Sequence, residues 1–219
     1  MQLPAAIAAI DARSPALRIR HLTGAQDRWH SCADLLAGTE AGTDPTARWR
    51  RELEESTQDQ YLHPSPPGMS AAFILQWYCE ILAVPGAFAA VETEWVLDLS
   101  PECVDFTTAP GFGYPTQVGL RAGRSRPRPG PQERLEQAGE GYRRHALAFA
   151  RAYHPGVRMS SRQREGMVED MWERAVESAR AGHAGRGPRV LPRVSCCFIY
   201  ALPGCQACAG CPREGCAQA

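Results

Sequence analysis

Residues 69–84 read M-S-A-A-F-I-L-Q-W-Y-C-E-I-L-A-V, a stretch that is apolar nearly all the way around a helix. Helices that are apolar on every side are buried inside globular proteins. We therefore predict a central buried helix at Met69–Val84, around which the rest of the body packs. Pro85 interrupts the apolar residues that continue to Ala90.

The apolar stretches are too short to predict a membrane span. The longest, Ala71–Leu75 and Ile81–Ala90, fall below the roughly 18–20 residues that a span requires. No basic segment precedes the short apolar stretch at the N-terminus, so we expect no signal peptide. We expect a cytoplasmic protein with reduced thiols, in which clustered cysteines bind metal and do not form disulfides.

The composition is that of an ordinary globular chain. Of its 219 residues, 44% are hydrophobic and 22% are charged, which argues against disorder. Basic and acidic residues number 24 each, so the formal net charge is zero. This balance argues against a nucleic-acid partner bound by bulk charge.

Helical patterns surround the central stretch, and one segment has strand character. We predict helices at residues 4–10, 22–36, 44–61, 135–153 and 160–182. Three β-rich runs, at 94–99, 103–107 and 114–120, predict a small antiparallel sheet within about residues 91–120. The fold class is therefore α+β, a mainly helical body with a small sheet, followed by a cysteine-rich C-terminal module.

The C-terminal segment reads Arg193-Val-Ser-Cys-Cys-Phe-Ile-Tyr-Ala-Leu-Pro-Gly-Cys-Gln-Ala-Cys-Ala-Gly-Cys-Pro-Arg-Glu-Gly-Cys216. It holds six of the nine cysteines in the chain. Two sets of four have the spacing of metal ligands. The first is C-C-x10-C-x2-C, formed by Cys196, Cys197, Cys208 and Cys211. The second is C-x2-C-x2-C-x4-C, formed by Cys205, Cys208, Cys211 and Cys216.

Four thiolates without a nearby histidine favour zinc or an iron–sulfur cluster over hard cations. Pro203-Gly204 lies between the two cysteine pairs of the first set, and we expect a chain reversal there. Adjacent cysteines in a regular strand would point to opposite faces, so ligation by both requires an irregular backbone. That spacing is unusual for a structural zinc site. The second set resembles the start of a bacterial 4Fe-4S ferredoxin motif, but its last cysteine comes one residue late.

The run Ser-Cys-Cys-x-x-Tyr-x-x-Pro-Gly-x-x-x-Cys-x-x-Cys-Pro, with Arg193 just before it, resembles the C-terminal domain of the FhuF family of ferric-siderophore reductases. The resemblance implies a 2Fe-2S cluster held by the first set, Cys196, Cys197, Cys208 and Cys211. Cys205 and Cys216 are extra to the family pattern and remain possible alternative ligands. Arg193 and Arg213 flank the ligands and are candidates for tuning the cluster.

The resemblance divides the chain into an FhuF-like body at 1–185 and a 2Fe-2S-binding segment at 186–219. It implies an oxidoreductase that reduces chelated Fe(III) to Fe(II) by one electron and releases the iron in the cytosol. The partners would be a ferric siderophore and an electron donor such as a ferredoxin or a flavin reductase. The arginine-rich loop 121–128 is either an ordinary solvated loop or an electropositive rim for an anionic chelate or an acidic partner.

Two other functions remain open from the residues alone. The chain could be an iron–sulfur electron carrier or redox sensor that reduces no substrate. It could also be an interaction module stabilised by zinc, with no redox function. We find no catalytic triad or pair of carboxylates that would indicate a different chemistry.

Overall fold

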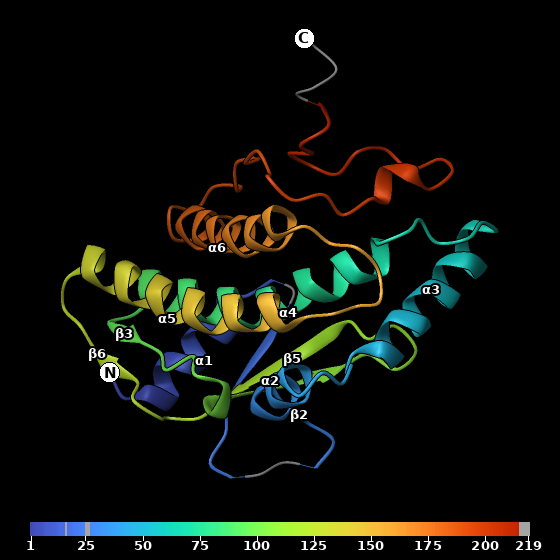
Figure 1. The fold of residues 1–219 in the computed structure, drawn as a ribbon. Helices are drawn as coiled ribbons and strands as arrows, with labels where there is room; N and C mark the ends of the chain where they lie inside the picture. Colours follow the sequence, from blue (N-terminus) through green and yellow to red (C-terminus); the bar gives the residue numbers. More distant parts are fainter. Residues whose placement is uncertain (16, 25–26, 215–219) are drawn as a thin grey trace.

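A computed structural model describes residues 1–15, 17–24 and 27–214 of the chain. The described residues form a mainly helical body with a small sheet and an extended C-terminal segment (Figure 1). The six α-helices are α1 (Leu3–Arg13), α2 (Cys32–Glu40), α3 (Ala47–Tyr61), α4 (Met69–Glu92), α5 (Pro131–Ala152) and α6 (Ser161–His183). The α+β fold class is confirmed.

Helix α4 is the centre of the molecule, as predicted, and it packs against α1, α3, α5 and α6. It continues to Glu92, so the expected end before Pro85 is wrong. Proline inside a helix removes one backbone hydrogen bond and costs about 3 kcal/mol. Burial of the residues on both sides of Pro85 offsets this cost, since Ile81–Ala83 and Ala87–Ala90 are almost fully buried.

Among the described residues, α4 alone is long and apolar enough to cross a membrane. The chain thus has a longer apolar helix than its sequence predicted, because the helix runs through the proline. Within its most apolar window, 72% of the residues are buried inside the protein. A position at the centre of the core therefore accounts for its composition.

The main sheet has four strands in the order β1-β5-β4-β2. The strands are β1 (Arg18–His21), β2 (His30–Ser31), β4 (Val104–Thr108) and β5 (Pro115–Leu120). The predicted antiparallel pairing holds for β4 with β5. Strand β2 lies in a segment predicted to be helical, and it pairs antiparallel with β4. Strand β1, which the sequence did not indicate, pairs with β5 in parallel, so the sheet is mixed.

The remaining predicted strand lies outside this sheet. Within the run 94–99, only Trp95–Val96 forms a strand, β3, and it pairs with β6 (Arg126–Pro127). The arginine-rich loop therefore contributes a short edge strand. Residues 97–100 continue toward a single 3-10 turn, η1 (Pro101–Cys103), beside α5.

The N-terminal helix predictions are partly wrong. The expected helix at 22–36 begins only at Cys32, where the Ser31 hydroxyl caps it by accepting a hydrogen bond from the Asp34 amide. His30 and Ser31, directly before it, form β2 because they pair with β4. Gly38 lies inside α2 and does not cap it.

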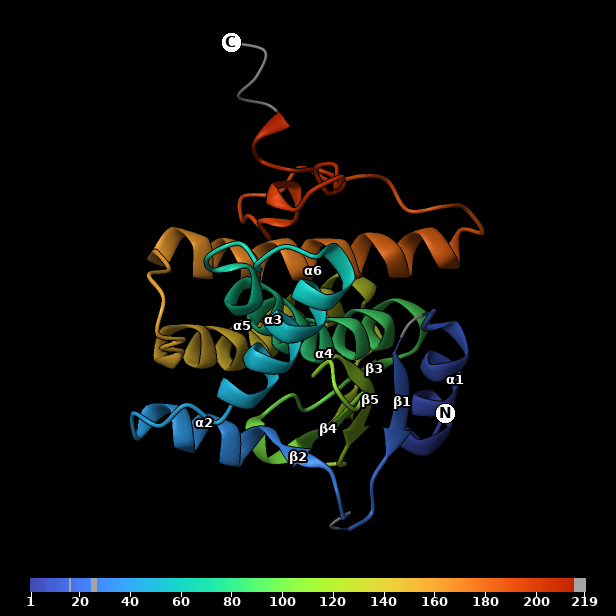
Figure 2. The ribbon, with the colours of Figure 1, turned by 90° about the vertical axis from the view of Figure 1, so that its right-hand side faces the viewer.

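The two long helices after the sheet match their prediction, and the Ser160 hydroxyl caps the second by accepting the Gln163 amide. They form the upper part of a layered body, in which α4 and α5 lie between α6 and the sheet (Figures 1 and 2). The three cysteines of the body, Cys32, Cys79 and Cys103, are buried. The outer face of α6 is thus the surface on which the C-terminal segment lies.

A buried histidine makes the stability of this body depend on pH. Burial lowers the pKa of His145 to about 4, and its ring bridges the Tyr78 hydroxyl and the Leu99 carbonyl. In the unfolded chain the His145 ring is protonated as the pH falls below its ordinary pKa of about 6.5. In the folded protein the ring stays neutral until the pH approaches 4. Stabilisation is therefore complete above about pH 6.5 and is lost as the pH falls toward 4, by about 3 kcal/mol.

We expect the Tm of the wild-type protein to fall more steeply than that of His145→Gln between pH 7.5 and 5. The exposed His154 serves as a matched control, and His154→Gln should follow the wild type. Parallel melting curves for wild type and His145→Gln would show that His145 does not carry this pH dependence.

Candidate metal centre

The cysteine-rich segment returns along the outer face of α6 after that helix ends (Figures 1 and 2). Three polar side chains of α6 face it, Gln163, Asp170 and Glu177, each seven residues from the next. Seven residues make almost two turns at about 3.6 residues per turn, so the three share one side of the helix. We call Gln163, Asp170 and Glu177 the polar stripe of α6.

Glu177 holds the start of the segment. Its buried carboxylate accepts hydrogen bonds from Arg186 Nη1 at 2.7 Å, from the Arg189 amide at 3.0 Å and from Arg189 Nη2 at 3.1 Å. These hydrogen bonds from two arginines fix the linker that follows α6 against that helix. The linker then leads to the cysteines.

Asp170 holds the segment just before the first cysteine. Its carboxylate accepts the amides of Val194 at 2.9 Å and Ser195 at 2.8 Å, together with the Ser195 hydroxyl. Arg193 forms an ion pair with the same carboxylate at 3.7 Å, and each of the two side chains is only 3% exposed. A buried carboxylate needs such partners, because an uncompensated buried charge costs several kcal/mol.

Gln163 holds the first cysteine itself. Its amide oxygen accepts the Cys196 backbone N–H at 3.0 Å, and its amide nitrogen donates to the Cys196 carbonyl at 2.5 Å. Both backbone groups of Cys196 are therefore satisfied by one side chain, as a neighbouring strand would satisfy them. This contact lets the chain leave regular structure at the adjacent cysteines, and Phe198 follows with φ of 62°.

The expected chain reversal at Pro203-Gly204 is present. The Cys205 amide donates to the Leu202 carbonyl at 3.1 Å, and Gly204 has φ of 75°. A second turn spans the C-x2-C pair, where the Cys211 amide donates to the Cys208 carbonyl at 2.9 Å. The two turns return the chain to the adjacent cysteines.

The reversal brings one thiol of each pair together. The sulfur atoms of Cys197 and Cys208 are 3.5 Å apart. Two thiolates on one tetrahedral metal at about 2.3 Å would be about 3.8 Å apart. Cys211 is also buried, while Cys196 and Cys208 are half-buried. In residues 1–15, 17–24 and 27–214, no three histidine, cysteine or acidic side chains converge on a single metal position.

This donor set fits a 2Fe-2S cluster better than a single ion. A zinc site needs its four thiolates around one point, whereas a 2Fe-2S cluster distributes four cysteines over two irons. Thiolates are the soft ligands that iron–sulfur clusters take. The close pair Cys197–Cys208 has nearly the sulfur separation expected of two ligands of one metal.

Arg193 contacts the cysteines directly. Its Nη1 lies 3.7 Å from Cys208 Sγ, and its Nη2 donates to Gln76 Oε1 at 3.1 Å and to Ser195 Oγ at 3.2 Å. Burial raises the pKa of the free Cys208 thiol to about 11, the neighbouring Cys197 thiol raises it as well, and the Arg193 guanidinium opposes both. Arg193 is therefore the positive charge nearest this thiol that the described contacts provide.

The other predicted residues lie apart from the close thiol pair. The Arg213 guanidinium is stacked on the Tyr200 ring at 4.7 Å. Cys205 lies close to Tyr61 at the end of α3, and the neighbouring thiol raises the pKa of the Tyr61 hydroxyl. Cys216 lies outside the described residues.

Residues 193–213 match the family model of the FhuF 2Fe-2S C-terminal domain. The similarity is confined to this matched segment, which we call the FhuF domain. No curated protein sequence matches the chain. The FhuF domain supports a 2Fe-2S cluster as the cofactor, in agreement with the donor set.

Sequence reasoning missed the residues that hold the FhuF domain in place, above all Gln163 and Asp170. The available signal was their seven-residue spacing with Glu177, which interrupts the apolar face of α6 with polar side chains. Gln76 on α4 had no comparable signal. Its role as a partner of Arg193 depends on the packing of α4 against α6.

Removing the Asp170 carboxylate should release the FhuF domain from α6. We expect Asp170→Ala to leave Arg193 and two backbone amides without their acceptor and to expose the Arg193–Val194 bond. Trypsin should cut this bond at least tenfold faster than in wild type, as followed by mass spectrometry. Glu173→Ala, which removes an exposed carboxylate from the same helix, is the matched control. Equal cleavage rates in the two variants would contradict this role.

Gly210 should be essential at the second turn. It has φ of 73°, and a Cβ there would lie 2.0 Å from the Leu191 carbonyl oxygen. We expect Gly210→Ala to reduce the iron bound per chain to less than half. Gly204→Ala has a similar φ but open space around it, so it should retain most of the iron. Metal analysis of both purified proteins measures the bound iron. Equal iron contents would show that the second turn does not need glycine at position 210.

Proposed function

We propose that the protein is a ferric-siderophore reductase, which reduces chelated Fe(III) to Fe(II) by one electron and releases the iron in the cytosol. The proposal rests on the match of residues 193–213 to the FhuF 2Fe-2S domain. This segment lies on the outer face of α6, and its Cys196 and Cys208 are half-buried. When bound, a 2Fe-2S cluster supplies one-electron transfer. Half-buried ligands at the molecular edge allow close approach by both an electron donor and a chelate.

We propose Cys196, Cys197, Cys208 and Cys211 as the ligands, with residues 186–219 as the cluster-bearing segment and 1–185 as the body that supports it. The polar stripe of α6 orients this segment, and Arg193 donates toward the Cys208 sulfur. Hydrogen bonds and positive charge at a thiolate stabilise the reduced, more negative state. The chain thus contributes position and electrostatics, and no general base or nucleophile is required.

Reduction explains release because the chelator is specific for the oxidised ion. Siderophore oxygens are hard donors, and Fe(II) is a softer ion of lower charge that such donors hold weakly. The partners of this proposal are a ferric siderophore and a one-electron donor protein such as a ferredoxin or a flavin reductase. Neither a nucleic acid nor a membrane span has a part in it.

The function is tested with anaerobic, reduced holoprotein, a ferric hydroxamate or catecholate chelate, and a ferrous-specific chromogenic trap. We expect trapped Fe(II) to appear with the wild type and to fall to background with Cys208→Ser. Reoxidation without any trapped Fe(II), for chelates of both classes, would overturn the proposal. It would leave an electron carrier that reduces no chelate.

The ligand assignment predicts a clear difference between cysteines. Cys205 is not part of the close thiol pair and lies near Tyr61, so Cys205→Ala should retain the visible absorption and the EPR signal of the reduced cluster. Cys197→Ala should lose both, because it removes a member of the close thiol pair. Loss of the signal in Cys205→Ala, with retention in Cys197→Ala, would favour the second cysteine set.

Arg193 should raise the reduction potential. Replacing it with Gln removes a buried positive charge beside Cys208, and we expect the potential to fall by roughly 50–100 mV. Arg193→Lys retains the charge and should shift the potential by less than half as much. An EPR-monitored redox titration measures both values, and an unchanged potential in Arg193→Gln would contradict this role.

A further inference from the structure

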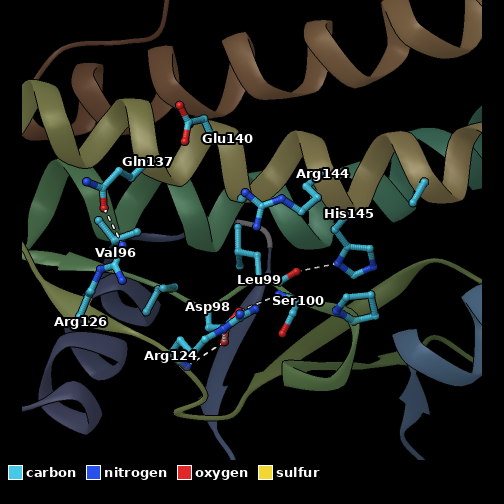
Figure 3. Close-up of a pocket in the computed structure, with 14 residues that line it drawn as sticks. Val96, Asp98, Leu99, Ser100, Arg124, Arg126, Gln137, Glu140, Arg144 and His145 are labelled. Carbon is cyan, nitrogen blue, oxygen red and sulfur yellow. Dashed lines mark hydrogen bonds and ion pairs between the residues drawn. The ribbon is translucent and has the colours of Figure 1, made fainter.

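A cavity of about 400 Å³ lies between α5 and residues 96–101, beside the arginine-rich loop (Figure 3). The C-terminal segment lies on the outer face of α6, on the other side of the helical layer (Figure 1). The cavity is therefore separate from the cysteines of the C-terminal segment. Its volume falls in the range of small-molecule sites, about 300–1,000 Å³.

One wall of the cavity is the face of α5 formed by Gln137, Gly141, Arg144, His145 and Ala148. Their spacing of three or four residues places them on one side of the helix. The opposite wall comes from residues 96–101, of which Val96, Leu97, Leu99 and Pro101 are apolar and Asp98 and Ser100 are polar. The cavity thus presents both apolar side chains and polar side chains to a ligand.

No neighbouring atom of the described residues requires a glycine at position 141. A Cβ on Gly141 would meet no atom within 4 Å, although this residue lies in the middle of α5 and lines the cavity. By contrast, a Cβ on Gly139 would approach Arg143 at 2.9 Å and the Trp172 ring at 3.2 Å. Glycine is a poor helix former. Its presence at position 141 keeps space open on the side of the cavity.

The polar side is rich in arginine. Arg124 is engaged by Asp98 at 3.4 Å, and Arg126 reaches only the neutral Gln137 amide at 3.3 Å. Within the described part of the chain, Arg144 has no hydrogen-bond or ion-pair partner, and its side chain extends toward Leu99 (Figure 3). The Glu140 carboxylate stands at the rim. Among the described residues, no carboxylate pairs with the guanidinium groups of Arg126 and Arg144, which are thus available to an anion.

His145 closes the inner end of the cavity as a fixed wall. Its Nδ1 donates to the Leu99 carbonyl at 2.7 Å, so its Nε2 accepts from the Tyr78 hydroxyl at 2.8 Å. Both ring nitrogens are occupied. His145 therefore supplies shape to the cavity and no charge.

We propose that this cavity binds an organic anion with an apolar or aromatic body. The anionic group would pair with Arg144 and Arg126, since guanidinium groups recognise carboxylate, sulfonate and phosphate. The apolar body would lie against Leu97, Leu99 and Ala148, over Gly141. This site does not depend on the reductase proposal, because none of its residues belongs to the FhuF domain.

The test uses the full-length holoprotein and anilinonaphthalene sulfonate, a fluorescent anion with an aromatic body. We expect saturable binding to the wild type, at least tenfold weaker binding to Arg144→Gln, and at least tenfold weaker binding to Gly141→Leu. Each removes one of the two features on which the site depends, the free guanidinium and the open space.

Matched controls exclude general effects. Arg51→Gln removes an exposed arginine from α3, and Gly182→Leu fills open space on α6, and both should bind as the wild type does. The cluster EPR signal should be the same in all five proteins, which separates this test from that of the reductase. Absence of saturable binding, or equal affinity in Arg144→Gln, Gly141→Leu and the controls, would overturn the proposal.

Discussion

The buried carboxylate of Asp170 is the contact on which the metal centre depends. It accepts two consecutive backbone amides and a hydroxyl from the C-terminal segment, and it balances the buried guanidinium of Arg193. Arg193 in turn reaches a cysteine sulfur and the side chain of Gln76 on α4. One charged pair therefore links the core helix, the outer helix and the thiols.

This arrangement explains how a segment with so little regular structure can place its cysteines. Up to Glu214, the last described residue, the segment pairs with no strand, and the polar stripe of α6 satisfies its backbone groups instead. The two tight turns, at residues 202–205 and 208–211, then bring the later cysteines back to Cys196 and Cys197. A rigid helix beneath an irregular ligand segment is an effective way to limit reorganisation when an electron is gained or lost.

The sequence predicted the elements whose signals are local. The central helix, the two long helices, the turn at Pro203-Gly204 and the spacing of the cysteines follow from periodicity, caps and motif. It did not predict β1, because four residues carry little periodic signal and their pairing with β5 is distant in sequence. It also ended α4 too early, because tertiary burial on both sides of Pro85 outweighs the local preference. The sequence also did not indicate that Asp170 and Gln163 hold the cysteine-rich segment. Their contacts join residues that are 24 or more positions apart, and such pairing leaves no local signal.

We propose that one electron passes from the FhuF domain of this chain to chelated Fe(III). In a single-turnover experiment, anaerobically reduced protein is mixed with a ferric hydroxamate or catecholate chelate, and the EPR signal and the trapped Fe(II) are followed together. We expect the S = 1/2 signal of the reduced protein to disappear as Fe(II) appears, in equal amounts. A reduced signal that persists beside intact ferric chelates of both classes would show that this electron transfer does not occur.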